Sequence, residues 1–161
     1  MNEDAPKVFI SYSHDSPTHK QWVAELAAEL RKNRIDAILD QWDLGLGDDI
    51  TKFMEDGLTE SDRVLIICTE NYVRKADAGE GGVAYERMIV TAELVRDLGT
   101  QKFIPIIKQK SKEPTLPKFL GARLYIGLTT RLSGLEPLLP AYHPAVWSAY
   151  LGSVKRRNSI Q

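Results

Sequence analysis

Short apolar runs alternate with longer amphipathic patterns along most of the chain, and this alternation constrains the fold more than any other feature. The apolar runs fall at residues 7–11, 35–39, 63–69, 102–107 and 122–128. Runs of this length predict buried strands. Strands that alternate with helices form parallel sheets with right-handed crossovers and helices on both faces. The sequence therefore predicts an α/β fold of flavodoxin-like type, an open parallel sheet of five strands in the order 2-1-3-4-5.

Helical periodicity fills the segments between these runs. Apolar residues recur at helical spacing over residues 18–32, which predicts an amphipathic helix. A second helix is expected near Ile50, capped by Asp48 or Asp49. The polar segment 70–82 is expected to be a long loop that leads into a further helix.

Composition and charge are those of an ordinary single-domain protein. The 161 residues suffice for one full core, and the formal charge of −1 gives no overall basic field for nucleic acid or an anionic membrane. A single cysteine, Cys68, and the absence of a long apolar run or leader predict a cytoplasmic protein. We expect a disordered N-terminus over 1–6, one domain over 7–154, and a tail or linker stub over 155–161.

Ligands of such sheets bind outside the carboxyl ends of the strands, near the point where the strand order reverses. The segments expected there are SYSHDSP, DQWDLGLGDD and the loop after the third strand. None contains a glycine-rich phosphate-binding loop. The histidines lack metal-ligand spacing, and acids that precede a helix are more often caps than ligands. We therefore expect neither a metal nor a bound cofactor.

An acid, Glu86, lies just beyond two glycines where the next helix should begin. Helical periodicity puts Glu86 at the margin of an apolar stripe formed by Tyr85, Met88, Ile89, Ala92 and Val95. A carboxylate in a first helical turn stabilises the helix by about 0.3–1 kcal/mol through the macrodipole and needs no further role. The sequence around Glu86 is compatible both with a purely structural role and with a functional one.

Four motifs, taken in order, resemble a Toll/interleukin-1 receptor (TIR) domain. They are KVFISYSHDS, DAILDQWDLGLGDDITKFMEDGL, SDRVLIICTENYV and an acid early in the following helix. The spellings SYSHDS and LDQWDL resemble the SEFIR subgroup as found in bacteria. The resemblance covers residues 6–128 and implies the flavodoxin-like fold. It also implies two classes of function, namely scaffolds that signal by self-association and enzymes that cleave NAD.

The resemblance also implies site residues. In members that cleave NAD, a glutamate in the helix after the third strand is catalytic, and this position falls on Glu86. The dinucleotide would lie between that helix and Tyr12, Ser13, Asp40, Trp42, Leu44 and Gly47. Gly82 stands where many members carry a tryptophan, so a stacking ring would have to come from Trp42, Tyr72 or Tyr12. Three of these residues also have structural alternatives, because Trp42 can simply cover the sheet edge, Tyr12 can form a structural hydrogen bond and Asp40 can cap its turn.

One carboxylate could suffice for this chemistry. Glycosidases pair two acids because an alkoxide leaves poorly without a proton. Nicotinamide leaves NAD as a neutral molecule, so the carboxylate needs only to stabilise positive charge on the ribose. We therefore predict an NAD glycohydrolase or ADP-ribosyl cyclase, with NAD as substrate, in bacterial anti-phage defence or signalling. The alternatives are a non-enzymatic scaffold that acts by homotypic protein interaction and a nucleoside deoxyribosyltransferase-like enzyme.

The loop 40–49 predicts self-association. It follows an expected edge strand and carries Trp42, Leu44, Leu46 and Gly47, more apolar surface than a free loop usually exposes. In family members that cleave NAD, this loop of an adjacent subunit commonly completes the site. We expect a homo-oligomer, with other TIR domains or a fused sensor domain as further partners and with neither nucleic acid nor a membrane.

Overall fold

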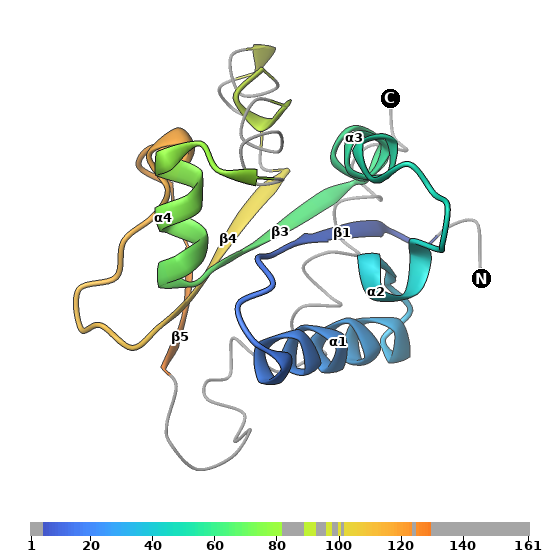
Figure 1. Ribbon diagram of the computed structural model, residues 1–161, viewed down its shortest axis with the longest axis horizontal. Helices are drawn as coiled ribbons and strands as arrows, with labels where there is room; N and C mark the ends of the chain where they lie inside the picture. Colours follow the sequence, from blue (N-terminus) through green and yellow to red (C-terminus); the bar gives the residue numbers. More distant parts are fainter. Residues whose placement is uncertain are drawn as a thin grey trace.

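The computed structural model describes residues 5–81, 89–92, 96, 97, 100, 102–123 and 125–129. Within these ranges the chain forms one parallel sheet of five strands in the order β2-β1-β3-β4-β5 (Figure 1). The strands are β1 (Lys7–Ser11), β2 (Asp36–Ile38), β3 (Arg63–Cys68), β4 (Phe103–Gln109) and β5 (Ile126–Thr129). The predicted fold class and strand order are confirmed.

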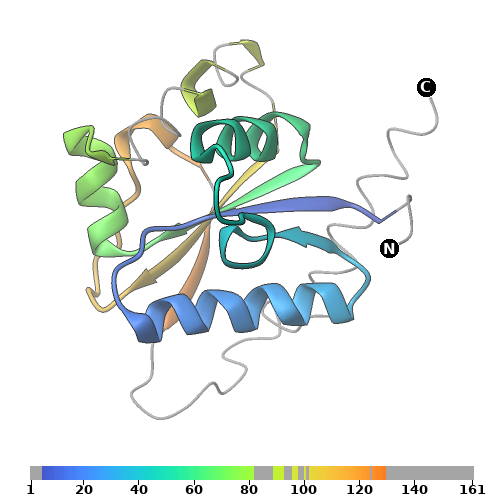
Figure 2. The ribbon, with the colours of Figure 1, turned by 45° about the vertical axis from the view of Figure 1, so that its right-hand side comes forward.

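Helices cover both faces of this sheet. The first is α1 (Pro17–Lys32), which lies on one face, whereas α3 (Ile50–Glu60) and α4 (Glu70–Ala78) lie on the other (Figures 1 and 2). A short helix, α2 (Asp40–Asp43), follows β2, and a 3-10 turn, η1 (Lys118–Leu120), precedes β5. The described residues therefore form a three-layer α/β structure with β2 at one edge of the sheet.

Each face of the sheet has its own core. Side chains alternate along a strand, so β1 sends Val8 and Ile10 toward α1 and Phe9 toward α3. All six residues of β3 are buried, because this strand is covered on both faces. The core therefore continues to the end of the strands, where the site lies.

Side-chain caps fix where the helices begin. Ser16 Oγ accepts a hydrogen bond from the His19 amide at the start of α1. Asp49, rather than Asp48, caps α3 by accepting from the Lys52 amide at 3.1 Å. These bonds satisfy backbone N–H groups that have no partner within the helix.

The predicted loop over 70–82 is wrong for most of its length, because α4 occupies residues 70–78. Thr69 caps this helix, and Gly79 ends it with a left-handed φ of 70°. Tyr72, Val73 and Ala76 recur at helical spacing and are buried. The helix signals were present but were outweighed by the polar composition of the segment.

The helix expected beyond Gly81 is described only in part, at 89–92 and 96. There Val90 is buried and Ile89 packs beside it, whereas Ala92 is exposed. The buried face therefore includes Val90 and not Ala92, a correction of the predicted stripe. Glu86 lies outside the described residues.

One close contact brings α3 against β1. A Cβ atom at Gly57 of α3 would lie 2.2 Å from Cδ2 of Phe9. Real Cβ atoms do not come this near another carbon, so the position accommodates no side chain unless the neighbours move. Phe9 also packs on Phe53, with the ring centroids 5.7 Å apart.

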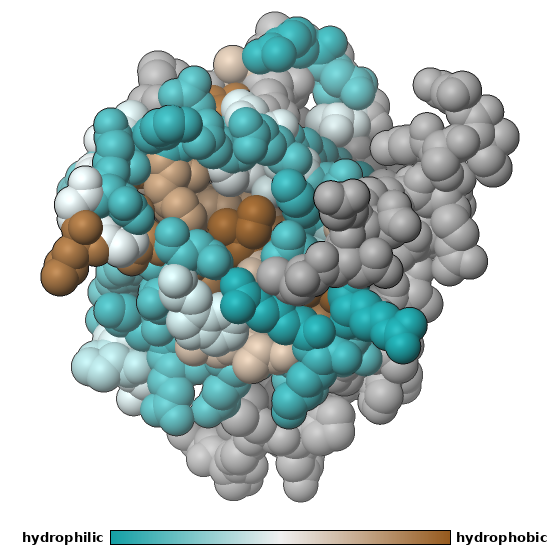
Figure 3. Space-filling view, turned by 90° about the vertical axis from the view of Figure 1, so that its right-hand side faces the viewer, coloured by the Kyte–Doolittle hydropathy of each residue, from teal (hydrophilic) through white to brown (hydrophobic). Residues whose placement is uncertain are grey.

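On the face shown in Figure 3, the described surface is mostly hydrophilic, with apolar surface recessed between hydrophilic side chains. In the part of the chain that the structure describes, the large apolar side chains with most exposure are Trp42, Leu46, Ile50 and Tyr125. Every helix in that part is too short or too polar to cross a bilayer.

Candidate functional site

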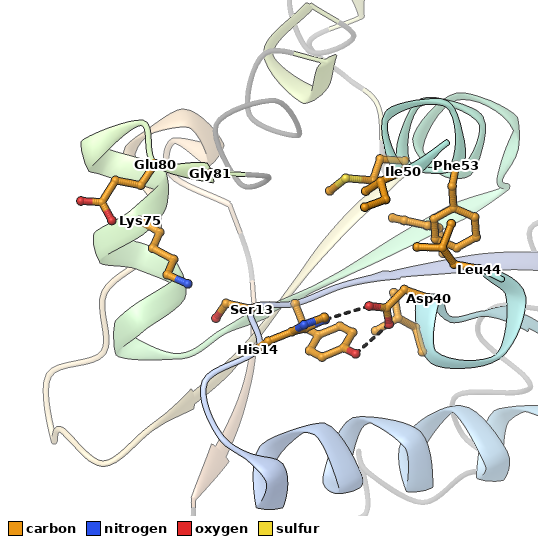
Figure 4. Close-up of a pocket in the computed structure, with 13 residues that line it drawn as sticks. Ser13, His14, Asp40, Leu44, Ile50, Phe53, Lys75, Glu80 and Gly81 are labelled. Atoms are coloured by element: carbon orange, nitrogen blue, oxygen red, sulfur yellow. Dashed lines mark hydrogen bonds and ion pairs between the residues drawn. The ribbon is translucent and has the colours of Figure 1, made fainter. Parts of the chain in front are cut away.

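A pocket of about 530 Å³ opens at the carboxyl end of β1, between α3 and the end of α4 (Figure 4). This volume is typical of sites for small molecules. Its floor is formed by β1 and the residues that follow it, and its two walls come from different parts of the chain. The order of the strands explains the position of the pocket, because ligands of such sheets bind where this order reverses, which is between β1 and β3.

The wall toward α3 is apolar. It is lined by Leu44, Ile50, Phe53 and Met54, with Phe9 at the floor. Aromatic and aliphatic side chains of this kind favour a flat ring or another apolar group. This end of the pocket can therefore bind the ring portion of a ligand.

Asp40, the first residue of α2, ties the floor to the neighbouring wall. Its Oδ1 accepts a hydrogen bond from the Tyr12 hydroxyl at 2.7 Å, and its Oδ2 lies 2.7 Å from His14 Nε2 (Figure 4). Gln41 Nε2 donates to the same Tyr12 oxygen at 2.8 Å. Burial and the bond to Asp40 raise the pKa of Tyr12, so its hydroxyl stays a donor. These bonds hold the Asp40 carboxylate in place before any ligand binds.

Asp15 ties the loop after β1 to the start of α4. Its carboxylate accepts hydrogen bonds from Ser13 Oγ, from Thr69 Oγ1 at 2.6 Å and from Asn71 Nδ2 at 2.7 Å. Burial by itself would raise the pKa of Asp15, but these hydrogen bonds outweigh it, and the pKa is lowered. The carboxylate is therefore charged at neutral pH and positions Ser13 on the pocket wall.

The wall toward α4 carries two charged side chains, one of which faces the pocket and one of which does not. Lys75, Glu80 and Gly81 line this side. Glu80 forms an ion pair with Arg74 at 3.2 Å, and Figure 4 shows its carboxylate turned away from the pocket. The Lys75 ammonium points into the pocket toward Ser13 and His14 (Figure 4). Among the described residues, no carboxylate lies within ion-pair distance of it.

A buried polar cluster supports the floor from the α1 side. Lys108 Nζ lies 2.9 Å from His19 Nδ1 and 4.6 Å from the centre of the Trp22 ring. Burial, followed by the charge of Lys108, lowers the pKa of His19 to about 4. Neutral His19 accepts a hydrogen bond from the Lys108 ammonium at Nδ1, and its Nε2 has no partner among the described residues. The ring of Tyr12 packs edge-on against His19, with the centroids 6.0 Å apart.

Four of the predicted binding residues line this pocket, namely Tyr12, Ser13, Asp40 and Leu44. The strand order brings them together although they come from two separate segments. Asp40 is the first residue of α2, whose N-cap is Leu39, so its side chain does not cap the helix, and it lines the pocket. Contact of these residues with a dinucleotide stays a prediction.

Three other predicted residues lie elsewhere. Tyr72 is 1% exposed in the core, where its hydroxyl lies 3.0 Å from Ser11 Oγ, so it offers no ring face to a ligand in this pocket. Trp42 packs under the Arg31 guanidinium at 4.5 Å, outside the pocket lining. Gly47 is outside the lining too and supplies a φ of 88° in the turn before α3.

The predicted association loop does not present its apolar residues together. Residues 40–43 form α2, Leu44 faces the pocket, and Trp42 is 42% exposed beneath Arg31. Leu46 is fully exposed and projects without cover, and Ile50 at the start of α3 is 61% exposed. Leu46 and Ile50 are therefore the apolar side chains that this region offers most openly to another molecule.

The acids of this region act within the fold. Asp43 pairs with Arg31 and accepts from the Leu39 amide, and Asp48 accepts from the Gly45 amide. Across the described ranges, no three His, Cys, Asp or Glu side chains gather in a metal-binding group. Cys68 is buried, which raises the pKa of its thiol.

Sequence reasoning missed several pocket residues. His14 was not among the predicted binding residues, although it follows the first strand at the edge where ligands bind. Lys75 falls within the loop predicted over 70–82, so the sequence did not predict its position on the pocket wall toward α4. The Thr69 cap together with Gly79 would have revealed α4 and put Lys75 in its last turn.

Comparison with known proteins agrees with this architecture. The family described as "TIR domain" matches residues 8–139. The crystal structure of a prokaryotic SEFIR domain is 34% identical, covers 94% of this chain and 97% of that chain, and superposes with a TM-score of 0.63. The SEFIR domain of interleukin-17 receptor B is 11% identical over 96% of this chain and 99% of that chain, with a TM-score of 0.61, and shares the fold.

No curated protein matches the sequence significantly. The family match spans most of the chain, and the 34% identity to a prokaryotic SEFIR domain extends over nearly all of it. The resemblance seen in the four sequence motifs is thus confirmed. The chain belongs to the TIR domain family and is a SEFIR-like member of it.

Proposed function

We propose that this TIR domain cleaves NAD at the bond between nicotinamide and ribose, and that Glu86 is the carboxylate that acts on the ribose. The observation that carries the proposal is the pocket at the carboxyl end of β1, with one apolar wall and a fixed carboxylate, Asp40. A domain that acted only through its outer surface would not need a cavity of this size at its sheet edge.

The lining suits the parts of a dinucleotide. The wall formed by Ile50, Phe53 and Met54 can take a flat ring, and Asp40 lies at its margin. A carboxylate has about four acceptor positions, so Asp40 can accept from a ribose hydroxyl while it keeps Tyr12 and His14. Binding and orientation of the ribose are therefore the roles of this side of the pocket.

Glu86 lies five residues along the chain from Gly81, which lines the pocket rim. Five residues span at most about 18 Å, so the chain allows the Glu86 carboxylate to reach the ribose. The catalytic role itself comes from the family resemblance, which assigns this position in members that cleave NAD.

The reaction requires little of the protein. The bond between ribose C1′ and the pyridinium nitrogen breaks, its electron pair stays on the nitrogen, and nicotinamide leaves neutral. Positive charge develops on the ribose, and a carboxylate beside the ring stabilises it. Water then adds to C1′ and loses a proton to solvent, which gives ADP-ribose. In a cyclase, a nitrogen of the adenine adds to C1′ instead.

Nicotinamide release from NAD by concentrated or artificially clustered protein tests the proposal. Glu86→Gln and Glu86→Ala should abolish release with no change in thermal unfolding. Glu60→Gln, an exposed acid at the end of α3, is the matched control and should retain wild-type activity. A well-folded Glu86→Ala protein with full activity would exclude the assignment of Glu86. No release by the wild type in any clustered state would favour a scaffold.

A non-enzymatic scaffold is the second candidate, and the exposed Leu46 and Ile50 favour it. Apolar side chains this open can pack against a second copy of the domain. If association also activates cleavage, specific activity should rise with protein concentration, and Leu46→Asp should suppress the rise. Specific activity that stays constant from nanomolar to high micromolar protein, with only monomer in sedimentation, would rule out activation by association. Products from deoxynucleosides, measured alongside, would indicate a deoxyribosyltransferase instead.

A further inference from the structure

Lys75 is distinctive among the charged side chains of the pocket, because its ammonium faces the cavity and has no ion partner among the described residues. It stands in the last turn of α4, and its side chain is half-buried. Lysines are usually solvated or paired, and their long side chains gain little by pointing into a cavity. An anionic group of a ligand would give this ammonium a partner.

The other charged side chains of the lining have partners of their own. Asp40 accepts from Tyr12 and lies against His14, and Glu80 pairs with Arg74 outside the cavity. On the α4 side, the charge of the described lining that a ligand can pair with is therefore the positive charge of Lys75. A ligand with negative charge near the α4 wall fits this arrangement, and one with positive charge there does not.

The geometry separates this charge from the apolar wall. Figure 4 shows Lys75 on the α4 side of the cavity and Ile50 and Phe53 on the opposite side, with Ser13 and His14 between them. Among the described residues, no atom would lie within 4 Å of a Cβ at Gly81 on the rim. A ligand that fills the pocket therefore carries a ring at one end and an anionic group some distance from it.

We propose that Lys75 binds the diphosphate of the dinucleotide and makes the pocket select diphosphate-linked substrates over nucleosides. This inference rests on the proposed function, since it names the part of NAD that the α4 wall recognises. A lysine ammonium binds phosphate oxygens through charge-assisted hydrogen bonds, which are stronger than neutral ones. Lys75 is thus a specificity determinant and takes no part in breaking the glycosidic bond.

Binding of ADP and of adenosine tests the inference, because the two ligands differ only in the diphosphate. Equilibrium dialysis with clustered protein should show that ADP binds at least tenfold more tightly than adenosine. Lys75→Met should remove most of that difference, and Lys75→Arg should restore it. Lys112→Met removes the same charge from an exposed loop and is the matched control. Added salt should weaken ADP binding in the wild type much more than in Lys75→Met.

Kinetics give an independent measurement. Lys75→Met should raise the KM for NAD at least tenfold and leave kcat within about threefold. The KM for nicotinamide riboside, which has the same scissile bond but no diphosphate, should not change. A merely structural effect of the substitution would move both substrates alike.

The outcomes separate this inference from the proposed function. Lys75-dependent ADP binding without nicotinamide release would leave the inference standing and remove cleavage. Cleavage of NAD by a folded Lys75→Met protein with unchanged KM would remove the inference and leave cleavage standing. Equal binding of ADP and adenosine by the wild type, or no binding of either, would overturn the role of Lys75.

Discussion

Two sides of the pocket are built in opposite ways: the polar side formed by the end of β1 and the start of α2, here called the fixed wall, and the wall toward α4, here called the available wall. On the β1 and α2 side, the polar groups are joined to one another, as Asp40 is to Tyr12 and His14. On the α4 side, Lys75 faces the cavity without an ion partner among the described residues, and Glu80 is paired at the surface. The first wall is fixed by its own hydrogen bonds, and the second has a charge available for a ligand.

Under the two proposals, the fixed wall orients the ligand and the available wall selects it by charge. Groups that are held in place before binding orient a ligand without further ordering, and this lowers the entropic cost of association. A charge without a partner contributes most when the ligand supplies one. Substitutions of the side chains that support these two walls test how much of the order of each wall is intrinsic to the fold.

The largest effect is expected from acidification, through His19 beneath the fixed wall. Burial lowers the pKa of His19 to about 4, whereas in the unfolded chain it is near 6.5. Between these values the unfolded chain binds a proton that the folded protein does not. Stability should therefore be complete above pH 6.5 and fall by about 3 kcal/mol as the pH falls to 4. Urea unfolding across this range measures it.

Two variants isolate the contribution of His19. His19→Phe should remove most of the slope between pH 6.5 and 4. Lys108→Met should reduce the slope only in part, because burial is a larger cause of the lowered pKa than the lysine charge. An unchanged slope in a folded His19→Phe protein would show that this histidine does not limit stability in acid.

A smaller effect is expected from Asp15→Asn, which weakens the link between the loop after β1 and the start of α4. The carboxylate accepts from Ser13, Thr69 and Asn71, and the variant retains its size but loses its charge. We expect a loss of about 2 kcal/mol, since charge-assisted bonds contribute more than neutral ones but this site is exposed. Thermal unfolding at pH 7 checks it, and a loss below about 0.5 kcal/mol would mean that the link is unimportant.

The smallest effect compares the walls directly. Tyr12→Phe removes the hydroxyl that donates to Asp40 and should lower stability by about 1 kcal/mol. Glu80→Gln breaks the exposed pair with Arg74 on the other wall and should change stability by less than about 0.5 kcal/mol. Chemical denaturation of both variants measures the difference. Equal losses would contradict the contrast between the fixed and the available wall.

The sequence predicted the fold because hydrophobic periodicity records which residues are buried. It placed Tyr12 and Asp40 at one edge, since both follow strands whose carboxyl ends meet there. It could not predict their hydrogen bond, which joins residues 28 apart and depends on the position of α2. It also missed Lys75, because the polar composition of 70–78 hid the helix that aims it.

The sequence could not predict the surroundings of aromatic residues whose packing partners are distant along the chain. Trp42 is 42% exposed, but Arg31 from α1 covers one face of its ring. Tyr72 looked available after the third strand, but α4 turns it into the core. Burial of a side chain depends on which elements pack against it, and a local sequence pattern does not specify those elements.

The contact between Gly57 and Phe9 also sets the dimensions of the site. Phe9 and Phe53 both line the pocket, and α3 carries Phe53 on the same helix as Gly57. A methyl group at position 57 would meet the Phe9 ring at 2.2 Å, so either this ring or α3, which carries Phe53, would have to move. The width of the apolar end of the pocket thus depends on the absence of a Cβ atom at Gly57. Gly57 does not line the pocket, but its lack of a side chain influences the size of the ring that the apolar end can bind.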